Sequence, residues 1–305
     1  MQHGAFIVSE DVREAVDAGR PVLALESTIF THGLPRPRNL EVAREAEEHV
    51  RALGVVPATI GVVDGTPTVG LSPDEIERLS TSDGVVKASL RDLPIAAAKG
   101  LSAGTTVAAT AHLAHLAGVT VFSTGGLGGV HRGAQHTFDE SADLGTLAGL
   151  PLVVVSAGVK SILDIPLTLE RLETLNLAVV GYRTTDYPGI YNSDSGYDIE
   201  YSVDSPAEIA RIVAIRDALG VESTLLVANP VPDAAQLSPE LHDDVLARAL
   251  AEADAQGVSG HDTTPFLLDF MQRETGGRSL DVNVEVYRGN VGLGAEIAIA
   301  VAAAR

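Results

Sequence analysis

The chain has 305 residues, which suits one large α/β domain or two small ones. Its 41 acidic and 21 basic residues give a formal net charge of −20, which argues against a nucleic-acid polymer as partner. There is no cysteine, so disulfides, thiolate nucleophiles and cysteine-based metal sites are excluded. No apolar run is long enough to span a membrane, and the first residues lack a signal-peptide pattern, so we expect a cytoplasmic protein without a membrane partner.

Short runs rich in Val, Ile and Leu alternate with segments of helical periodicity along the whole chain. The apolar runs predict strands at 22–25, 59–63, 85–87, 119–123, 152–155, 177–181 and 224–228. Helices are predicted at 39–53, 73–79, 105–117, 167–174, 206–219 and 239–255, with an alanine-rich helix near 295–304 at the end.

Sequence patterns that mark helix starts, together with the apolar strands, predict a fold class. Ser72 and Ser205 each precede a proline and have a glutamate three positions later, as helix N-caps often do. Most predicted strands are apolar on both faces, as in sheets covered by helices on each side. We therefore expect α/β structure: a single domain over residues 1–305, a three-layer α/β/α sandwich with a largely parallel central sheet. The irregular stretch 184–205 is expected to cover a site or meet another subunit.

Three ionisable residues end or follow apolar strands, where ligands gather in parallel sheets. Burial at such a position raises the pKa of a carboxyl group, so Glu26 suits a general acid, unless it only caps a helix or pairs with an arginine. Lys87 suits a phosphate or carboxylate ligand, unless its side chain simply points into water. Lys160 follows a fully apolar strand, and desolvation there would make its amine nucleophilic; the alternative is a lysine extending outward at a helix start.

Two further segments carry polar groups. Four glycines precede His131 and Arg132 in the 124–133 segment, which predicts a ligand loop rather than a simple turn, although it matches neither G-x-G-x-x-G nor the Walker A pattern. Asp139 and Asp143 are four apart, so a helical turn would place both on one face. Oxygen ligands of this kind favour Mg²⁺ or Mn²⁺ over zinc, whereas the alternative is a pair of solvated acids near a helix start.

In this order, the segments closely resemble the pseudouridine-5′-phosphate glycosidase family, also called pseudouridylate synthase or indigoidine synthase A-like. The resemblance runs from about residue 9 to the C-terminus and rests on ALESTI at 24–29, VVKAS at 85–89, TGGLGGVHRG at 124–133, TFDESADL at 137–144 and AGVKSILDIP at 157–166. Each motif is weak alone, but their joint order is specific.

The resemblance implies a reversible reaction in which pseudouridine 5′-phosphate and water give uracil and ribose 5-phosphate. It implies Lys160 as the nucleophile, Glu26 as the proton donor and Asp139 as the ligand of one Mn²⁺ ion per subunit. A homotrimer is also implied. Substrate-binding positions carried over from the family are Lys87, Val107 (through its backbone), Ser141, Ala142 and Asp143, and the pocket motifs add Thr124, His131 and Asn283.

The chemistry accounts for these residue types. A C–C glycosidic bond has no heteroatom leaving group, so the paired carboxylates of ordinary glycosidases do not suffice. A neutral lysine amine can bond to C1′ and leave later through an imine. An acid is needed to assist ring opening or protonate the uracil carbon, and a metal with bound water can polarise the uracil carbonyl groups.

The sequence departs from the family pattern at two places, and two alternative functions stay open. Gly289 stands where the family commonly has an asparagine, and the 187–197 stretch has Asn192, Ser193 and Asp194 where a basic residue is common. A different Schiff-base lyase, such as an aldolase-like enzyme acting on a phosphosugar, would keep both lysines but release no uracil. A phosphosugar-binding protein would keep the pocket without turnover.

Overall fold

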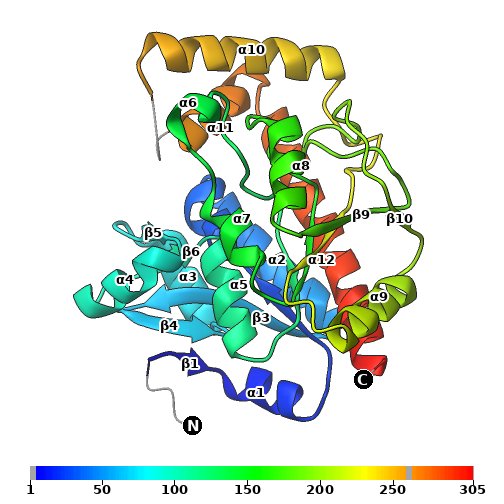
Figure 1. Ribbon diagram of the computed structural model, residues 1–305. Coiled ribbons are helices and arrows are strands. Elements are labelled where there is room, and N and C mark those ends of the chain that lie inside the picture. The colour runs from blue at the N-terminus through cyan, green and yellow to red at the C-terminus, as the bar shows by residue number, and fades with distance from the viewer. Residues whose placement is uncertain (1–4, 259–262, 305) are drawn as a thin grey trace.

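The computed structural model describes residues 5–258 and 263–304, and within them a single large sheet forms the centre of the molecule (Figure 1). Its strand order is β1-β4-β3-β2-β7-β8-β11-β9-β10, with β6 joined to β3 and β5 joined to β6. The strands are β1 (Ile7–Val8), β2 (Val22–Leu25), β3 (Val56–Val63), β4 (Thr66–Val69), β5 (Val86–Ala88), β6 (Ala103–Thr105), β7 (Val121–Ser123), β8 (Val153–Ser156), β9 (Ala178–Tyr182), β10 (Ser202–Val203) and β11 (Leu225–Ala228).

The middle of the sheet is parallel, which confirms the predicted fold class. β2 pairs in parallel with β3 and β7, β7 with β8, and β11 with both β8 and β9. β4 and β6 run antiparallel to β3, so one side of the sheet is mixed. The reason is local: Asp64 and Gly65 both have positive φ and close a tight hairpin between β3 and β4.

Helices cover both faces of the sheet, with α5 and α7 on one side of the strands and α2 and α12 on the other (Figure 1). Alternate residues of one strand enter different cores: Leu23 and Leu25 pack with α2, α9 and α12, whereas Val22 and Ala24 pack with α1 and α5. The helices are α1 (Glu10–Asp17), α2 (Arg38–Ala52), α3 (Pro73–Thr81), α4 (Leu93–Lys99), α5 (Val107–Leu116), α6 (Ala134–Thr137), α7 (Ala142–Leu147), α8 (Ile165–Thr174), α9 (Pro206–Ala218), α10 (Pro239–Ala255), α11 (Thr263–Glu274) and α12 (Arg278–Ala303).

The C-terminal helix is much longer than expected, because α12 begins at Arg278 and not near residue 295. The expectation was wrong because glycines 289, 292 and 294 weaken the helical signal of the sequence. Gly294 has a packing role: a Cβ there would lie 1.9 Å from Ser123 Oγ, so only glycine lets α12 approach β7 this closely. The expected caps are present, with a capping box between Ser72 and Glu75 and a Ser205 cap on α9.

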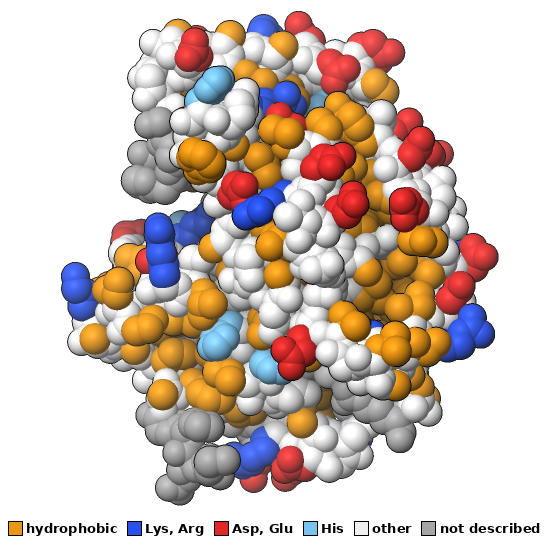
Figure 2. Space-filling model, in the orientation of Figure 1, with side chains coloured by type: hydrophobic (Ala, Val, Ile, Leu, Met, Phe, Trp, Pro, Cys, Tyr) orange, Lys and Arg blue, Asp and Glu red, His pale blue; other side chains and the backbone are white. Residues whose placement is uncertain are grey.

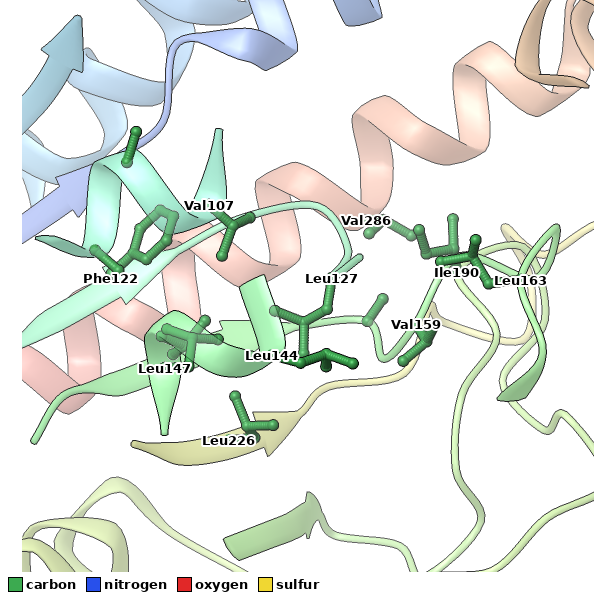
Figure 3. Close-up of a cluster of buried hydrophobic side chains, with 14 of the residues drawn as sticks. Val107, Phe122, Leu127, Leu144, Leu147, Val159, Leu163, Ile190, Leu226 and Val286 are labelled. Atoms are coloured by element: carbon green, nitrogen blue, oxygen red, sulfur yellow. The ribbon is translucent and has the colours of Figure 1, made fainter. Parts of the chain in front are cut away.

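An apolar cluster supports the loops at the carboxyl ends of the central strands (Figure 3). Val107, Leu127, Leu144 and Val159 are all buried in it. They come from the start of α5, the loop after β7, α7 and the loop after β8, so this packing fixes two loops and two helices relative to one another. None of the described helices is long and apolar enough to cross a membrane.

Candidate active site

Glu26 directly follows β2 and lies almost buried at the carboxyl end of the sheet, with 7% of its surface exposed. Its two carboxylate oxygens accept hydrogen bonds from the hydroxyl groups of Thr28 and Thr124. Thr124 follows β7, the neighbour of β2, so two adjacent strands deliver the acid and one of its partners. These partners differ from both structural alternatives, a helix cap and an arginine ion pair. Hydrogen bonds to both oxygens therefore fix the orientation of the Glu26 carboxyl group.

Lys160 lies in the loop between β8 and α8, next to the Thr124 loop. Its Nζ donates a hydrogen bond to the carbonyl oxygen of Gly126 at 2.8 Å. Burial lowers the pKa of Lys160 and nearby Lys87 acts in the same direction, whereas Glu26 and Asp143 oppose the shift. The lysine is not at a helix start, since α8 begins at Ile165 with Asp164 as its cap. Strands β2, β7 and β8 thus bring an acid, a hydroxyl and the amine of a half-buried lysine to one edge.

Asp143 ties three segments of the site together through its carboxylate. Oδ1 accepts a hydrogen bond from the backbone N–H of Ala108 at 2.9 Å, and Oδ2 accepts one from Gly128 at 3.0 Å. A Cβ on Gly128 would lie 2.2 Å from Ser141 Oγ, so glycine is required for this close approach. The predicted substrate-binding residue therefore uses its side chain to hold the start of α5 against the glycine loop.

The expectation that Asp139 and Asp143 share one helical face is wrong. Phe138 has a positive φ of 56° and ends α6, and Ser141 caps the separate helix α7, which begins at Ala142. Asp139 therefore lies in the short link between two helices, whereas Asp143 is inside the second. The spacing of four residues satisfied the helical period, but it did not reveal that the left-handed Phe138 ends one helix before Asp139 and that the next helix begins only after it.

Lys87 and the start of α5 lie near each other because β5, which carries Lys87, pairs in parallel with β6, which leads into α5. The Lys87 side chain is exposed. The pKa of His32 is lowered, first by the burial of the His32 ring itself and then by the positive charge of Lys87. The Val107 side chain is buried in the core, so only its backbone can face a ligand (Figure 3). The surface is hollowed between the part that carries α6 and the part that carries β5, with Lys or Arg side chains on the lower rim (Figure 2).

Asp139 and His131 face each other, with Nδ1 of the histidine 3.8 Å from Oδ2 of the aspartate. The Asp139 side chain is 39% exposed, so water can reach its carboxylate. Among residues 5–258 and 263–304, no group of three or more histidines and acids gathers as a metal cage. One carboxylate completed by water fits a hard cation such as Mn²⁺ or Mg²⁺ and does not fit zinc.

The irregular stretch 184–205 covers the Lys160 loop, which agrees with the expectation that it covers a site. Ile190 N–H donates to the carbonyl of Ala157 at 3.0 Å, and Gly189 forms a bridge with Gly158. Asn283, predicted in the pocket, donates from Nδ2 to the hydroxyl of Tyr191 at 3.3 Å. The stretch therefore joins α12 to the lysine loop.

One residue that holds the Thr124 loop was not predicted from the sequence. Asn290 Nδ2 donates to the carbonyl oxygens of Thr124 and Gly125, at 2.7 and 3.1 Å, and its Oδ1 accepts from Asn229. Gly289, the departure from the family pattern, is exposed, and a Cβ there would be 3.7 Å from Asn229 Nδ2. Because Asn290 is 61 residues from Asn229 and at least 165 from Thr124 and Gly125, no local pattern could have revealed these contacts.

Together these features define an α/β protein with a lysine-centred site at the carboxyl edge of a parallel sheet. The family described as "Indigoidine synthase A like protein" matches residues 11–300, and the chain belongs to that family. The resemblance seen in the sequence is thereby confirmed.

Relatives and solved structures agree along nearly the whole chain. The pseudouridine-5′-phosphate glycosidase of Saccharopolyspora erythraea is 66% identical over 296 residues, which cover 97% of this chain and 98% of that protein. The protein of the same name from Caldanaerobacter subterraneus subsp. tengcongensis is 47% identical over 292 residues, covering 96% and 95%. The prealnumycin C-glycosynthase AlnA, solved with ribulose 5-phosphate, superimposes with a TM-score of 0.90 at 34% identity, covering 98% of this chain and 97% of that one. An indigoidine synthase A-like protein from Thermotoga maritima superimposes with a TM-score of 0.89 at 36% sequence identity, with the same coverage of both chains.

Proposed function

We propose that this protein cleaves the C–C glycosidic bond of pseudouridine 5′-phosphate, reversibly, to uracil and ribose 5-phosphate through a covalent adduct on Lys160. The observation that carries the proposal is the Lys160 amine, whose pKa is lowered by burial and which shares a site with the Glu26 carboxyl group. Relatives at 47–66% identity are named pseudouridine-5′-phosphate glycosidases, which supports the same substrate.

Lys160 supplies the electron pair that the reaction needs. Its neutral amine bonds to C1′ while the C1′–O4′ bond of the ring breaks and O4′ takes up a proton. The new C1′-bound nitrogen then loses a proton, which restores its lone pair. The nitrogen lone pair then forms a C=N bond as the C1′–C5 bond breaks, and that electron pair leaves with uracil, whose C5 takes a proton. Water hydrolyses the imine and frees ribose 5-phosphate. The hydrogen bond to Gly126 holds the amine at a fixed place in the site.

Glu26 is the proposed proton donor. Hydroxyl groups of Thr28 and Thr124 hold its two oxygens, so the carboxyl group cannot rotate away from the reacting atoms. Transfer of its proton to O4′ or to the uracil carbon matches the two protonations that the reaction requires. Regeneration of the acid by the water that cleaves the imine completes the cycle.

The remaining predicted residues suit the two ends of the substrate. Lys87 and the backbone N–H groups at the starts of α5 (Val107) and α7 (Ser141 to Asp143) suit the phosphate, because both offer positive potential. Asn283 carries an amide that matches the donor and acceptor edge of uracil. Asp139, with His131 beside it, would hold Mn²⁺, which when bound stabilises negative charge on the departing base.

Release of uracil from pseudouridine 5′-phosphate in the presence of Mn²⁺ tests the proposal. We expect uracil and ribose 5-phosphate in equal amounts, and no turnover from Lys160→Ala. An aldolase-like enzyme would convert a phosphosugar without releasing uracil, and a binding protein would retain ribose 5-phosphate without turnover. Either result would replace the proposal. The homotrimer and the cytoplasmic location stay predictions.

A further inference from the structure

The residue beside Lys160 is held by a histidine from a helix far along the chain. Ser161 Oγ and His242 Nε2 are 2.7 Å apart, and both residues are buried. His242 lies near the start of α10, 81 residues after Ser161. Neither side chain has a part in the reaction proposed above. A buried hydroxyl–imidazole contact this close to the reacting amine therefore needs its own explanation.

His242 lies where three parts of the site meet. Its ring is 6.0 Å from the ring of Tyr191, whose hydroxyl accepts the hydrogen bond from Asn283. Arg132 donates to the carbonyl oxygen of Ser161 at 3.2 Å, so this residue is held through its backbone as well. The imidazole thus connects α10, the covering stretch and the lysine loop.

The arrangement of hydroxyl, imidazole and carboxylate is not that of a serine nucleophile. His242 Nδ1 is 3.0 Å from Asp243 Oδ1, but the Asp243 side chain is 79% exposed, so water competes for this bond. Ser161 itself is 4% exposed, which leaves its hydroxyl little access to a substrate. In serine hydrolases the orienting carboxylate is buried and the hydroxyl faces the substrate.

We infer that His242 is a positioning residue, which fixes the backbone of the Lys160 loop through its hydrogen bond to Ser161. The inference rests on the proposed function in taking Lys160 as the reacting amine. A reacting amine has to be held close to its productive position, and a loop achieves this only when neighbouring side chains lock it. The bond to Ser161, adjacent to Lys160, supplies such a lock from a helix.

Four variants separate positioning from general stability. His242→Leu removes the hydrogen bond and keeps an apolar side chain of moderate size, whereas His242→Gln keeps a polar group that reaches Ser161. Ser161→Ala removes the same bond from the other partner, so the test stands even if His242→Leu does not fold. Val245→Ala, on the same helix and fully buried, is the matched control, because it costs packing without touching the bond.

The main readout is the rate at which ribose 5-phosphate forms a borohydride-trapped adduct on Lys160. Loss of one buried hydrogen bond predicts a rate about 3- to 10-fold slower in His242→Leu and in Ser161→Ala. His242→Gln should stay within about twofold of the unsubstituted protein, since it restores the bond. The double variant should be no slower than either single one, because both remove the same interaction. Val245→Ala should lower the unfolding temperature without slowing the adduct.

Other results would overturn the inference. These are an unchanged adduct rate in His242→Leu and Ser161→Ala, equal slowing by Val245→Ala, or additive slowing in the double variant. If the unsubstituted protein forms no adduct at all, the proposed function fails, and amide hydrogen exchange of the peptide 158–163 then decides the role of His242. Faster exchange in His242→Leu but not in His242→Gln supports the lock, and equal exchange refutes it.

Discussion

Replacing Asp143 should cost stability that is out of proportion to the size of the change. Its two oxygens accept hydrogen bonds from the backbone N–H groups of Ala108 and Gly128 at 2.9 and 3.0 Å. Asp143→Ala leaves both donors unpaired, at about 1–3 kcal/mol each, so the free energy of unfolding should fall by about 2–6 kcal/mol. Asp143→Asn keeps one acceptor and turns an N–H group toward the other donor, so we expect about half that loss.

Urea unfolding followed by circular dichroism measures this difference, with Asp139→Ala as the matched control. Asp139 lies only four residues away, but its side chain is 39% exposed, so its removal should change the free energy of unfolding by about 0.5 kcal/mol or less. Metal-dependent activity should nevertheless be lost in the control. If Asp143→Ala were as stable as Asp139→Ala, Asp143 would not hold the loops as described here.

Three further predictions concern the metal, the assembly and the buried amine. EDTA should abolish activity reversibly and Mn²⁺ should restore it best, because one carboxylate with water binds the ion weakly; full activity of metal-free protein would contradict the role of Asp139. Light scattering should give a trimer, and a mass near 31.7 kDa would exclude it. Burial lowers the pKa of Lys160 below 10.5 in the folded chain only, so the unfolded chain binds more protons between the two values and stability rises with pH there. Lys160→Met should therefore be more stable than the unsubstituted protein at pH 7, with an advantage that shrinks toward pH 10.5; a constant difference would show that the amine is not desolvated.

Much of the sheet could be predicted from the sequence because its central strands are apolar on both faces. Strands 22–25, 152–155 and 224–228 have no polar side, and that pattern is specific to a covered parallel sheet. The strands β1, β6 and β10 were missed because they have only two or three residues each. The predicted C-terminal helix was too short because glycines lower helical propensity, and propensity cannot show that Gly294 serves the packing of α12 against β7.

The candidate site was predictable where a polar residue ends an apolar strand. Glu26 and Lys160 stood out for this reason, and the structure places them after β2 and β8, the two strands that flank β7. The contacts from α10 and α12 were not predictable, since His242 and Asn290 meet their partners only through the fold. Asp143 was found for the wrong physical reason, because its side chain binds backbone N–H groups and does not face Asp139.

The proposed reaction requires a covalent bond between the Lys160 amine and the sugar. Incubation with ribose 5-phosphate and borohydride, followed by peptide mass spectrometry, detects this bond. We expect one reduced sugar phosphate per chain, on Lys160, with the adduct and turnover both absent in a folded Lys160→Ala variant. Lys87→Ala should keep the adduct and mainly weaken substrate binding, because a lysine that binds phosphate acts as a point charge. An adduct on Lys87, or an active Lys160→Ala variant, would show that Lys160 is not the nucleophile.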